Sequence, residues 1–409
     1  MDLLTIITIL LIISAAFSYL NERLIKLPGT IGVVTISVIV SVLILLAGNT
    51  SSGLANTFKT LASSIDFSKT VLDVMLGFLL FASAIHFDYK KLKEQRLPVF
   101  LLSTFGVAVS AGAFGGLLYL VTQALQIDIP MVYCFLFGAL ISPTDPIAVA
   151  AILNKSKIPP RLHTIISGES LFNDGLGLVL FIVLLEIAVQ PDTSVSLNKI
   201  LQLFAQEVLG GVAIGLMMGV IGYRMIRSVH NFQTIFLISI TLVFSISVIA
   251  TRTHVSIPLA AVTAGLIIGN NSLDKKHIVN LFLSRIWQLI DEVLNTILFV
   301  MIGLQLVTMP FLNNYWLIGF ISIIIILMAR AVSVSVPAIF LLRKISAANL
   351  AILTWSGLRG GISVAMALSL PASPYREIIL SSCYFIVIFS IIVQGLTLNR
   401  LVEKTTGEK

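Results

Sequence analysis

The stretch 168–174 reads GESLFND and carries two carboxylates, an amide and a hydroxyl inside an otherwise apolar run. In a helix, side chains four residues apart lie on the same face, so Glu169 with Asn173 and Ser170 with Asp174 form two adjacent polar stripes. An acidic residue near the centre of a membrane-spanning helix costs about 2.5 to 3.5 kcal/mol on insertion scales. We therefore expect a chain that carries two of them to use them.

The chemistry that these groups favour is the binding of a small cation. A carboxylate, a hydroxyl and a free backbone carbonyl are hard oxygen donors, which suit alkali cations and do not suit zinc or copper. The carboxylate of Asp174 can bind a proton instead of a cation. A site where cation and proton compete, and which opens alternately to the two sides of a membrane, performs antiport. One exchanging carboxylate makes one cation for one proton the simplest stoichiometry.

Composition puts these residues in a lipid bilayer. The chain has 409 residues, of which 57% are hydrophobic and 11% charged, with a mean hydropathy of +1.04, and no ordinary soluble domain has such values. Apolar runs of about 18 to 25 residues separate short charged clusters, which is the length of a membrane-spanning helix. A β-barrel would instead show alternating segments of about ten residues. The fold class is therefore an all-α integral membrane protein.

The apolar runs predict about thirteen transmembrane helices. They lie near 3–20, 30–48, 70–87, 97–123, 131–153, 162–189, 200–223, 233–251, 256–272, 284–307, 314–342, 347–371 and 377–399. The polar stretch at 168–174 falls in the helix over 162–189. We expect residues 1–409 to form a single transporter domain, without a soluble regulatory domain.

The basic residues give the orientation. A net charge of +7 would suggest nucleic acid as a partner of a soluble protein, but here the position of the charges matters more than their sum. Of the 26 Lys and Arg residues, two, Arg330 and Arg359, lie within predicted helices, and nineteen of the others lie on one side of the membrane. The remaining five lie on the opposite side: Lys59, Lys69, Lys199, Arg252 and Arg376. The positive-inside rule then puts the N-terminus outside and the C-terminus in the cytoplasm.

Two predicted helices are interrupted near their middles. The helix over 131–153 contains ISPTDP at 141–146, and the helix over 347–371 contains WSGLRGG at 355–361. Proline and clustered glycine free backbone groups that hydrocarbon cannot solvate. Such breaks can be simple kinks, but Asp145 in one and Arg359 in the other favour a transport site. Because the two helices run in opposite directions, they fit two inverted six-helix repeats joined by a linking helix.

The other buried charges allow two interpretations each. Arg330 lies alone in an apolar run and needs a partner, so we expect a Glu169–Arg330 ion pair, with direct binding of the ion by Glu169 as the alternative. Asp145 either binds the ion or neutralises the positive ends of half-helices. We favour a supporting role for Asp145, with access to the site.

Four features together resemble the monovalent cation/proton antiporters of the NhaP and sodium/proton exchanger type, in the cation:proton antiporter 1 family. They are PTDP at 143–146, GESLFND at 168–174, Arg330, and GLRGG at 357–361. The resemblance covers nearly the whole chain. It implies crossed broken helices in a core domain that moves against a dimerisation domain, in a homodimer within the lipid bilayer of a bacterial or archaeal plasma membrane.

The resemblance also assigns roles. Asp174 becomes the transport carboxylate, with Ser170 and the Thr144 backbone as further ligands, Asn173 and Asp145 shaping the site, and Arg359 supporting the broken helices. The transported ions would be H⁺ and Na⁺, with Li⁺ or K⁺ as alternatives, in an electroneutral exchange that serves pH and sodium homeostasis. One feature departs from the family pattern. A glutamate common in the third helix is replaced by Ala82, which leaves the ligand shell and the cation preference open.

Two other classes of membrane protein have to be considered. A channel also uses broken helices and charged filters, and saturable exchange driven by a proton gradient distinguishes an antiporter from it. An intramembrane protease needs facing aspartates, a Ser-His pair or a zinc motif. Asp145 with Asp174 can imitate an aspartyl pair, but the remaining motifs favour transport. We therefore expect no enzyme activity, no cofactor and no nucleic-acid partner.

Overall fold

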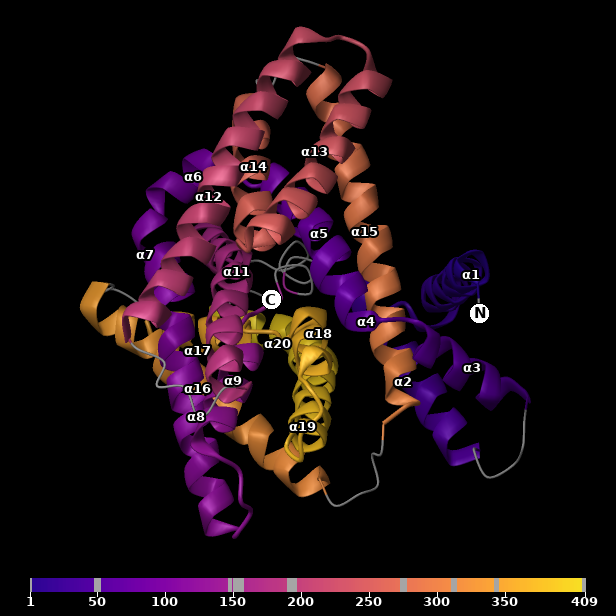
Figure 1. Ribbon diagram of the computed structural model, residues 1–409, viewed down its shortest axis with the longest axis vertical. Coiled ribbons are helices and arrows are strands. Elements are labelled where there is room, and N and C mark those ends of the chain that lie inside the picture. The colour runs from indigo at the N-terminus through magenta and orange to yellow at the C-terminus, as the bar shows by residue number, and fades with distance from the viewer. Residues whose placement is uncertain are drawn as a thin grey trace.

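The computed structural model describes residues 2–47, 53–145, 149, 158–189, 197–272, 278–309, 315–341 and 346–406. Throughout these ranges the regular structure is helical, without a β-strand (Figure 1). The prediction of an all-α membrane protein is confirmed.

The first half of the chain contains long apolar helices and several short helical segments. The helices are α1 (Leu3–Leu20), α2 (Gly29–Ala47), α3 (Gly53–Ser64), α4 (Phe67–Lys69), α5 (Leu76–Ile85), α6 (Tyr89–Glu94), α7 (Arg96–Leu101), α8 (Val107–Ala124), α9 (Met131–Ile141) and α11 (Pro160–Val189). Short π-helical segments join α4 to α5 and α7 to α8, so each pair forms one continuous rod. The apolar runs did not predict α3 and α6. In α6, Asp88 caps the first turn by accepting a hydrogen bond from the Lys90 N–H, 3.0 Å away, which stabilises a helix too short and polar to span a bilayer.

The second half contains both long helices and shorter ones. They are α12 (Leu197–Ser228), α13 (Phe232–Thr253), α14 (Ile257–Ser272), α15 (Ile278–Leu306), α16 (Trp316–Leu341), α17 (Ala347–Trp355), α18 (Gly361–Ser369), α19 (Arg376–Phe389) and α20 (Gly395–Thr406). The stretch predicted as one helix over 347–371 is thus two helices with a non-helical link.

In the described part of the chain, nine helical rods are long and apolar enough to cross a membrane. Three shorter apolar helices, Gly29–Leu45, Met131–Ile141 and Ile257–Asn270, add to them. Together with the interrupted pair α17 and α18, these correspond to the thirteen regions that the sequence predicts, and residues 146–148 and 150–153 of the region over 131–153 lie outside the described residues.

The helices pack into two groups, each with its own apolar core. In one group α14 lies between α5 and α12, beside α13. The contact of α14 with α12 is close because a methyl group at Gly219 would lie 2.9 Å from the Ala264 Cα atom. Small residues that let helices approach each other in this way are typical of membrane proteins.

In the other group α8 packs against α9 and α16, and α16 packs against α19. The two interruptions occupy matching places, because one lies between α8 and α11 and the other between α16 and α19. Two helices connect the groups. In Figure 1, α15 runs past α13 and α5 towards α2 and α3, and α11 contacts α9, α12 and α14. The candidate site lies between these two helices.

Candidate ion-binding site

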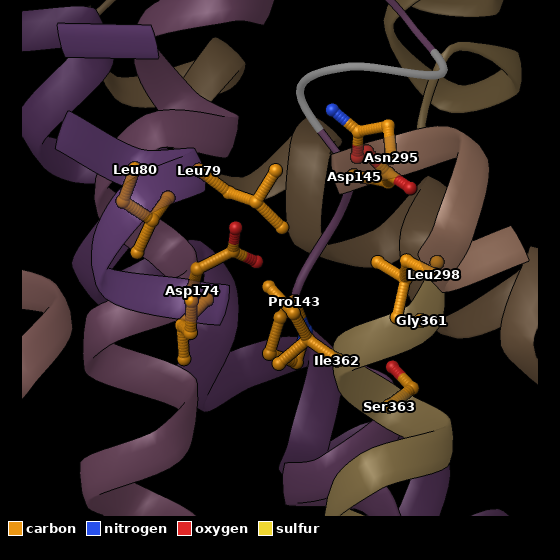
Figure 2. A pocket seen from close by; sticks show the side chains of 12 residues that line it. Leu79, Leu80, Pro143, Asp145, Asp174, Asn295, Leu298, Gly361, Ile362 and Ser363 are labelled. Carbon is orange, nitrogen blue, oxygen red and sulfur yellow. The ribbon is translucent and has the colours of Figure 1, made fainter. Parts of the chain in front are cut away.

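A small cavity of about 20 Å³ lies where α5, α11, α15 and the two interruptions meet. Its polar lining comes from Asp145, Asp174, Asn295 and Ser363. The other described residues that line it are Leu76, Leu79, Leu80, Pro143, Leu298, Gly360, Gly361 and Ile362. Figure 2 shows the Asp174 carboxylate pointing into the cavity from one side, with Asp145 and Asn295 on the other. A space of this size holds about one water molecule or one small ion.

Asp174 is buried in the middle of α11, and only 1% of its surface is exposed. Its Oδ2 atom has no hydrogen-bond partner within the described residues. A buried carboxylate oxygen without a partner is costly in a low-dielectric environment. A cation or a proton in the cavity would remove that cost.

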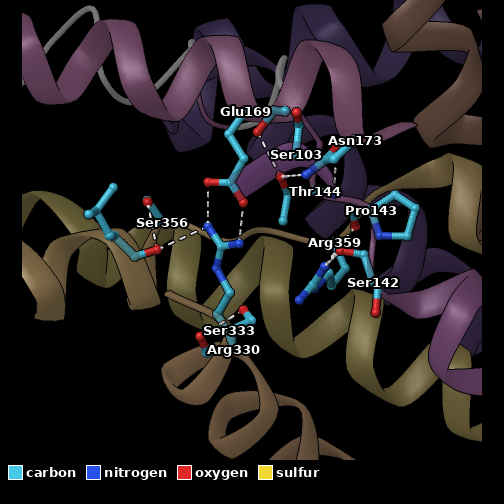
Figure 3. A network of polar contacts seen from close by, with 12 residues as sticks. Ser103, Ser142, Pro143, Thr144, Glu169, Asn173, Arg330, Ser333, Ser356 and Arg359 are labelled. Carbon is cyan, nitrogen blue, oxygen red and sulfur yellow. Dashed lines mark hydrogen bonds and ion pairs between the residues drawn. The ribbon is translucent and has the colours of Figure 1, made fainter. Parts of the chain in front are cut away.

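The two breaks contact each other, and of the predicted helix over 131–153 the structure describes α9, the break up to Asp145, and Val149. α9 ends at Ile141 because Pro143 has no N–H to continue the helical hydrogen bonds. The Asp145 N–H then donates to the Leu358 carbonyl, 2.8 Å away in the other break. The guanidinium of Arg359 donates to the carbonyls of Ser142 and Pro143, with 2.9 Å from Nη1 to the Pro143 oxygen (Figure 3). Arg359 therefore neutralises the partial negative charge at the end of α9.

Asp145 lies at the corresponding end of the second interrupted helix. α18 begins at Gly361, and its N-cap, Gly360, supplies no side-chain hydrogen bond. The Asp145 carboxylate occupies the space that a Cβ atom on Gly360 would need, at the end of α18 that carries partial positive charge. Asp145 is thus positioned to neutralise a half-helix and also lines the cavity, so its geometry is compatible with both roles left open by the sequence.

Gly360→Ala is expected to disturb this contact strongly. The added methyl group would overlap the Asp145 carboxylate, whereas the backbone at Gly360, with φ of −128° and ψ of −161°, suits any residue. We expect a loss of stability of about 1 to 3 kcal/mol from overpacking, together with impaired transport. Thermal unfolding of the purified protein measures the first effect. Gly116→Ala on α8, where a methyl group meets nothing within 4 Å, is the control, and equal behaviour of the two variants would contradict the geometry.

Thr144, Ser170 and Asn173 form a hydrogen-bonded cluster beside the cavity. The Asn173 amide donates from Nδ2 to the Thr144 hydroxyl at 2.7 Å, and its Oδ1 accepts from the Thr144 N–H at 3.2 Å. The Thr144 and Ser170 hydroxyls are 2.7 Å apart. All three residues are buried. Asn173 uses both ends of its amide on Thr144, so it holds α11 against the first interruption.

Glu169 and Arg330 form a buried ion pair, as their positions in the sequence predict. Two guanidinium nitrogens face the two carboxylate oxygens, with 2.8 Å between Nη2 and Oε2. Arg330 Nη2 also donates to the Leu353 carbonyl at 3.2 Å, in the last turn of α17. Arg330 therefore neutralises Glu169 and caps the half-helix that precedes the second interruption.

Several polar residues of this region were not singled out from the sequence. Asn295 lines the cavity from α15. Ser390 accepts a hydrogen bond from the Arg359 N–H at 2.9 Å and donates to Gln394 at 2.6 Å, and Gln394 donates to the Trp355 carbonyl at 3.3 Å. The four-residue spacing of Ser390 and Gln394 in an apolar run was the available signal.

Ala82 on α5 is fully buried. The described cavity lining on α5 consists instead of Leu76, Leu79 and Leu80. α5 therefore contributes an apolar wall to the cavity.

Comparisons with known proteins agree with this architecture. The family model for the transmembrane sodium/hydrogen exchanger matches residues 6–404. The chain is 38% identical to the Na⁺/H⁺ antiporter NhaP of Pseudomonas aeruginosa, over 98% of this chain and 97% of the relative. It is 29% identical to the Na⁺/H⁺ antiporter NhaH of Halobacillus dabanensis, over 97% of each. The structure of the sodium proton antiporter MjNhaP1 from Methanocaldococcus jannaschii superposes with a TM-score of 0.80 at 18% identity, covering 100% of both chains.

Proposed function

The chain belongs to the sodium/hydrogen exchanger family, and we propose that it is a secondary active antiporter that exchanges one monovalent cation for one proton. Asp174 is the residue at which cation and proton compete, with Thr144, Ser170, Asn173 and Asp145 forming the rest of the site. Residues 1–409 act as one transport domain, in which the helices of the two interruptions and α11 form the moving core.

One observation carries this proposal. The Asp174 carboxylate faces a cavity of about 20 Å³ where the breaks of two predicted helices meet, and its Oδ2 atom lacks a partner among the described residues. Interrupted helices that cross near the membrane midplane are the usual place for a transported ion in secondary transporters. A carboxylate there can carry a cation in one direction and a proton in the other.

The pattern of charges supports a one-for-one, electroneutral exchange. Glu169 is paired with Arg330, and Asp145 lies at the positive end of α18. Arg359 is committed to the carbonyls at the end of α9. Among these residues, Asp174 is the carboxylate that remains available for exchange, so binding one Na⁺ or one H⁺ leaves the same charge on the site.

Sodium is the first candidate for the cation, because the relatives NhaP and NhaH are named as Na⁺/H⁺ antiporters, with Li⁺ and K⁺ as alternatives. In this proposal the protein works in a bacterial or archaeal plasma membrane, with the N-terminus outside and the C-terminus in the cytoplasm, and contributes to pH and sodium homeostasis. It acts as a homodimer. Exposed apolar side chains on α1 and α12 leave surface for lipid and for a second copy.

The test is a transport assay with purified protein in liposomes that hold a proton gradient and a pH-sensitive dye. Adding Na⁺, Li⁺ or K⁺ outside should dissipate the gradient for at least one cation, with saturation, and the rate should not depend on an imposed membrane potential. Correctly inserted protein that responds to none of the cations at acidic, neutral or alkaline pH would refute the antiport proposal. A rate that changes with the potential would refute one-for-one exchange.

Competition at one carboxylate makes a further prediction. The half-saturating Na⁺ concentration should rise by up to about tenfold for each unit by which the pH falls, because cation binding must displace a proton. The maximal rate at saturating Na⁺ should change less. Titrating Na⁺ at several fixed pH values measures both quantities. A half-saturating concentration that is independent of pH would mean that cation and proton bind at separate groups.

A further inference from the structure

The helix α15 carries a polar pair, Asp291 and Asn295, in a long and otherwise largely apolar rod. The two residues are four apart and share one face of the helix. Asn295 is fully buried, and its side chain lines the same cavity as Asp174 and Asp145. Figure 2 shows it beside Asp145, with Asp174 across the cavity.

Hydrogen bonds fix which end of the Asn295 amide is which. Its Nδ2 atom lies 2.7 Å from the Asp291 backbone carbonyl and 3.0 Å from the Asp291 Oδ1 atom. Both of these oxygens accept, so the nitrogen must be the atom that faces them. The amide oxygen is thereby held at the opposite end of the group.

That amide oxygen has no partner. Within the described residues, Asn295 Oδ1 is buried without a hydrogen bond, as is Asp174 Oδ2. Leaving a buried acceptor unsatisfied costs about 1 to 3 kcal/mol, and such an atom in a native structure calls for a ligand, a water or a functional reason. Two unsatisfied acceptors on residues that line one small cavity call for a shared positive partner.

We propose that Asn295 Oδ1 is a direct ligand of the transported cation, supplied from α15, and that Asp291 is the residue that orients it. This inference deepens the proposed function and rests on it. An amide oxygen is a hard, neutral donor that suits an alkali cation. It adds an oxygen without adding charge, so it leaves the one-for-one exchange unchanged.

This assignment supplies an oxygen ligand in place of the helix-3 glutamate that Ala82 replaces. α5 contributes leucines to the cavity. Asp145, Asp174 and Ser363 line it from the first break, α11 and α18, and Asn295 adds an oxygen from α15. A cation bound by Asp174 and Asn295 connects α11 to α15, which packs against α2 and α5. The ion would therefore join the two helices that connect the helix groups.

The experiment compares Asn295→Leu with the wild type in two assays. Leucine has a similar volume but no polar atom, so we expect the half-saturating Na⁺ concentration for exchange to rise about tenfold or more, with a smaller change in the maximal rate. Cation-dependent thermal stabilisation of the purified protein should weaken by a similar factor, and the order of preference among Na⁺, Li⁺ and K⁺ should change. Asp291→Leu should produce a smaller shift, since the Asp291 backbone carbonyl still binds the amide.

Thr296→Val is the matched control, because Thr296 is the next residue on α15 and its hydroxyl bonds within the helix, to the Glu292 carbonyl at 2.8 Å. It should behave as the wild type. Wild-type exchange together with an unchanged Na⁺ requirement in Asn295→Leu would overturn the role of Asn295 and leave the proposed function standing. Absence of exchange in the wild type would instead refute the proposed function, and the binding assay would still judge Asn295. If Asn295→Leu does not fold, Asn295→Asp, which keeps an oxygen, should retain cation-dependent stabilisation, and its loss would count against the proposal.

Discussion

Asp174→Asn should reduce cation-driven proton movement to the level of liposomes without protein. Asparagine has nearly the shape of aspartate, but its amide cannot exchange a proton or carry the charge that balances a cation. Every other polar contact of α11, including those of Glu169 and Asn173, should persist. The dye assay with Na⁺, Li⁺ and K⁺ measures the effect.

Two further measurements separate this loss from misfolding. Asp73→Asn makes the same change at an exposed carboxylate of the membrane rod Phe67–Ile85, and it should exchange as the wild type does. Without added cation, Asp174→Asn should be more stable than the wild type by about 0.5 to 2 kcal/mol. Replacing a buried functional group that has no partner by a neutral one commonly stabilises a protein. Full activity in Asp174→Asn would remove this residue from the centre of the mechanism.

The stabilisation of the protein by bound cation is a second measurement that should distinguish the same variant from the wild type. A cation at 100 times its dissociation constant stabilises the wild type by about 2.7 kcal/mol through mass action. Asp174→Asn should lose this stabilisation while keeping the fold. Thermal unfolding with and without Na⁺ therefore tests binding at Asp174 independently of transport.

The membrane helices were predictable because the thickness of a bilayer fixes the length of the apolar run that spans it. Within the described residues, each of the thirteen predicted regions contains an apolar helix. The helices α3 and α6 were missed because they are short and polar, and hydropathy detects only long apolar segments. The start of α15 was placed near 284, whereas the helix begins at Ile278. Asp291 and Asn295 lie in the interior of this helix, and the sequence alone did not single them out.

The partners of buried charges were partly predictable. An isolated buried arginine requires a counter-ion, and this requirement alone pointed from Arg330 to Glu169. The second role of Arg330, as a cap on the Leu353 carbonyl, depends on how α16 meets α17. The contacts that Asp145 and Arg359 each make with the opposite break likewise exist only where the two breaks meet. Sequence spacing along one helix cannot reveal contacts between segments that are more than two hundred residues apart.

Glu169→Gln should destabilise the protein by about 3 to 5 kcal/mol, because it leaves the charge of Arg330 buried without its counter-ion. Both partners are almost inaccessible, with 0% and 5% of their surfaces exposed. The remaining hydrogen bond from Arg330 to Leu353 is to a neutral carbonyl and cannot replace a carboxylate. The fall in the unfolding temperature of the detergent-purified protein measures the effect, and the amount of protein inserted in the membrane should fall with it.

The same helix supplies a matched control for this effect. Glu186 is also on α11 and pairs with Lys199 at 2.8 Å, but the two side chains are 26% and 49% exposed. Glu186→Gln should therefore cost less than about 1 kcal/mol, as surface ion pairs usually do.

Removing both charges in Glu169→Gln with Arg330→Met should recover much of the stability lost in Glu169→Gln, because the unpaired buried charge is then gone. Equal losses in Glu169→Gln and Glu186→Gln would show that the buried pair does not hold α16 to α11, and a double variant worse than the sum of its parts would assign the stability to Arg330 as the cap of α17.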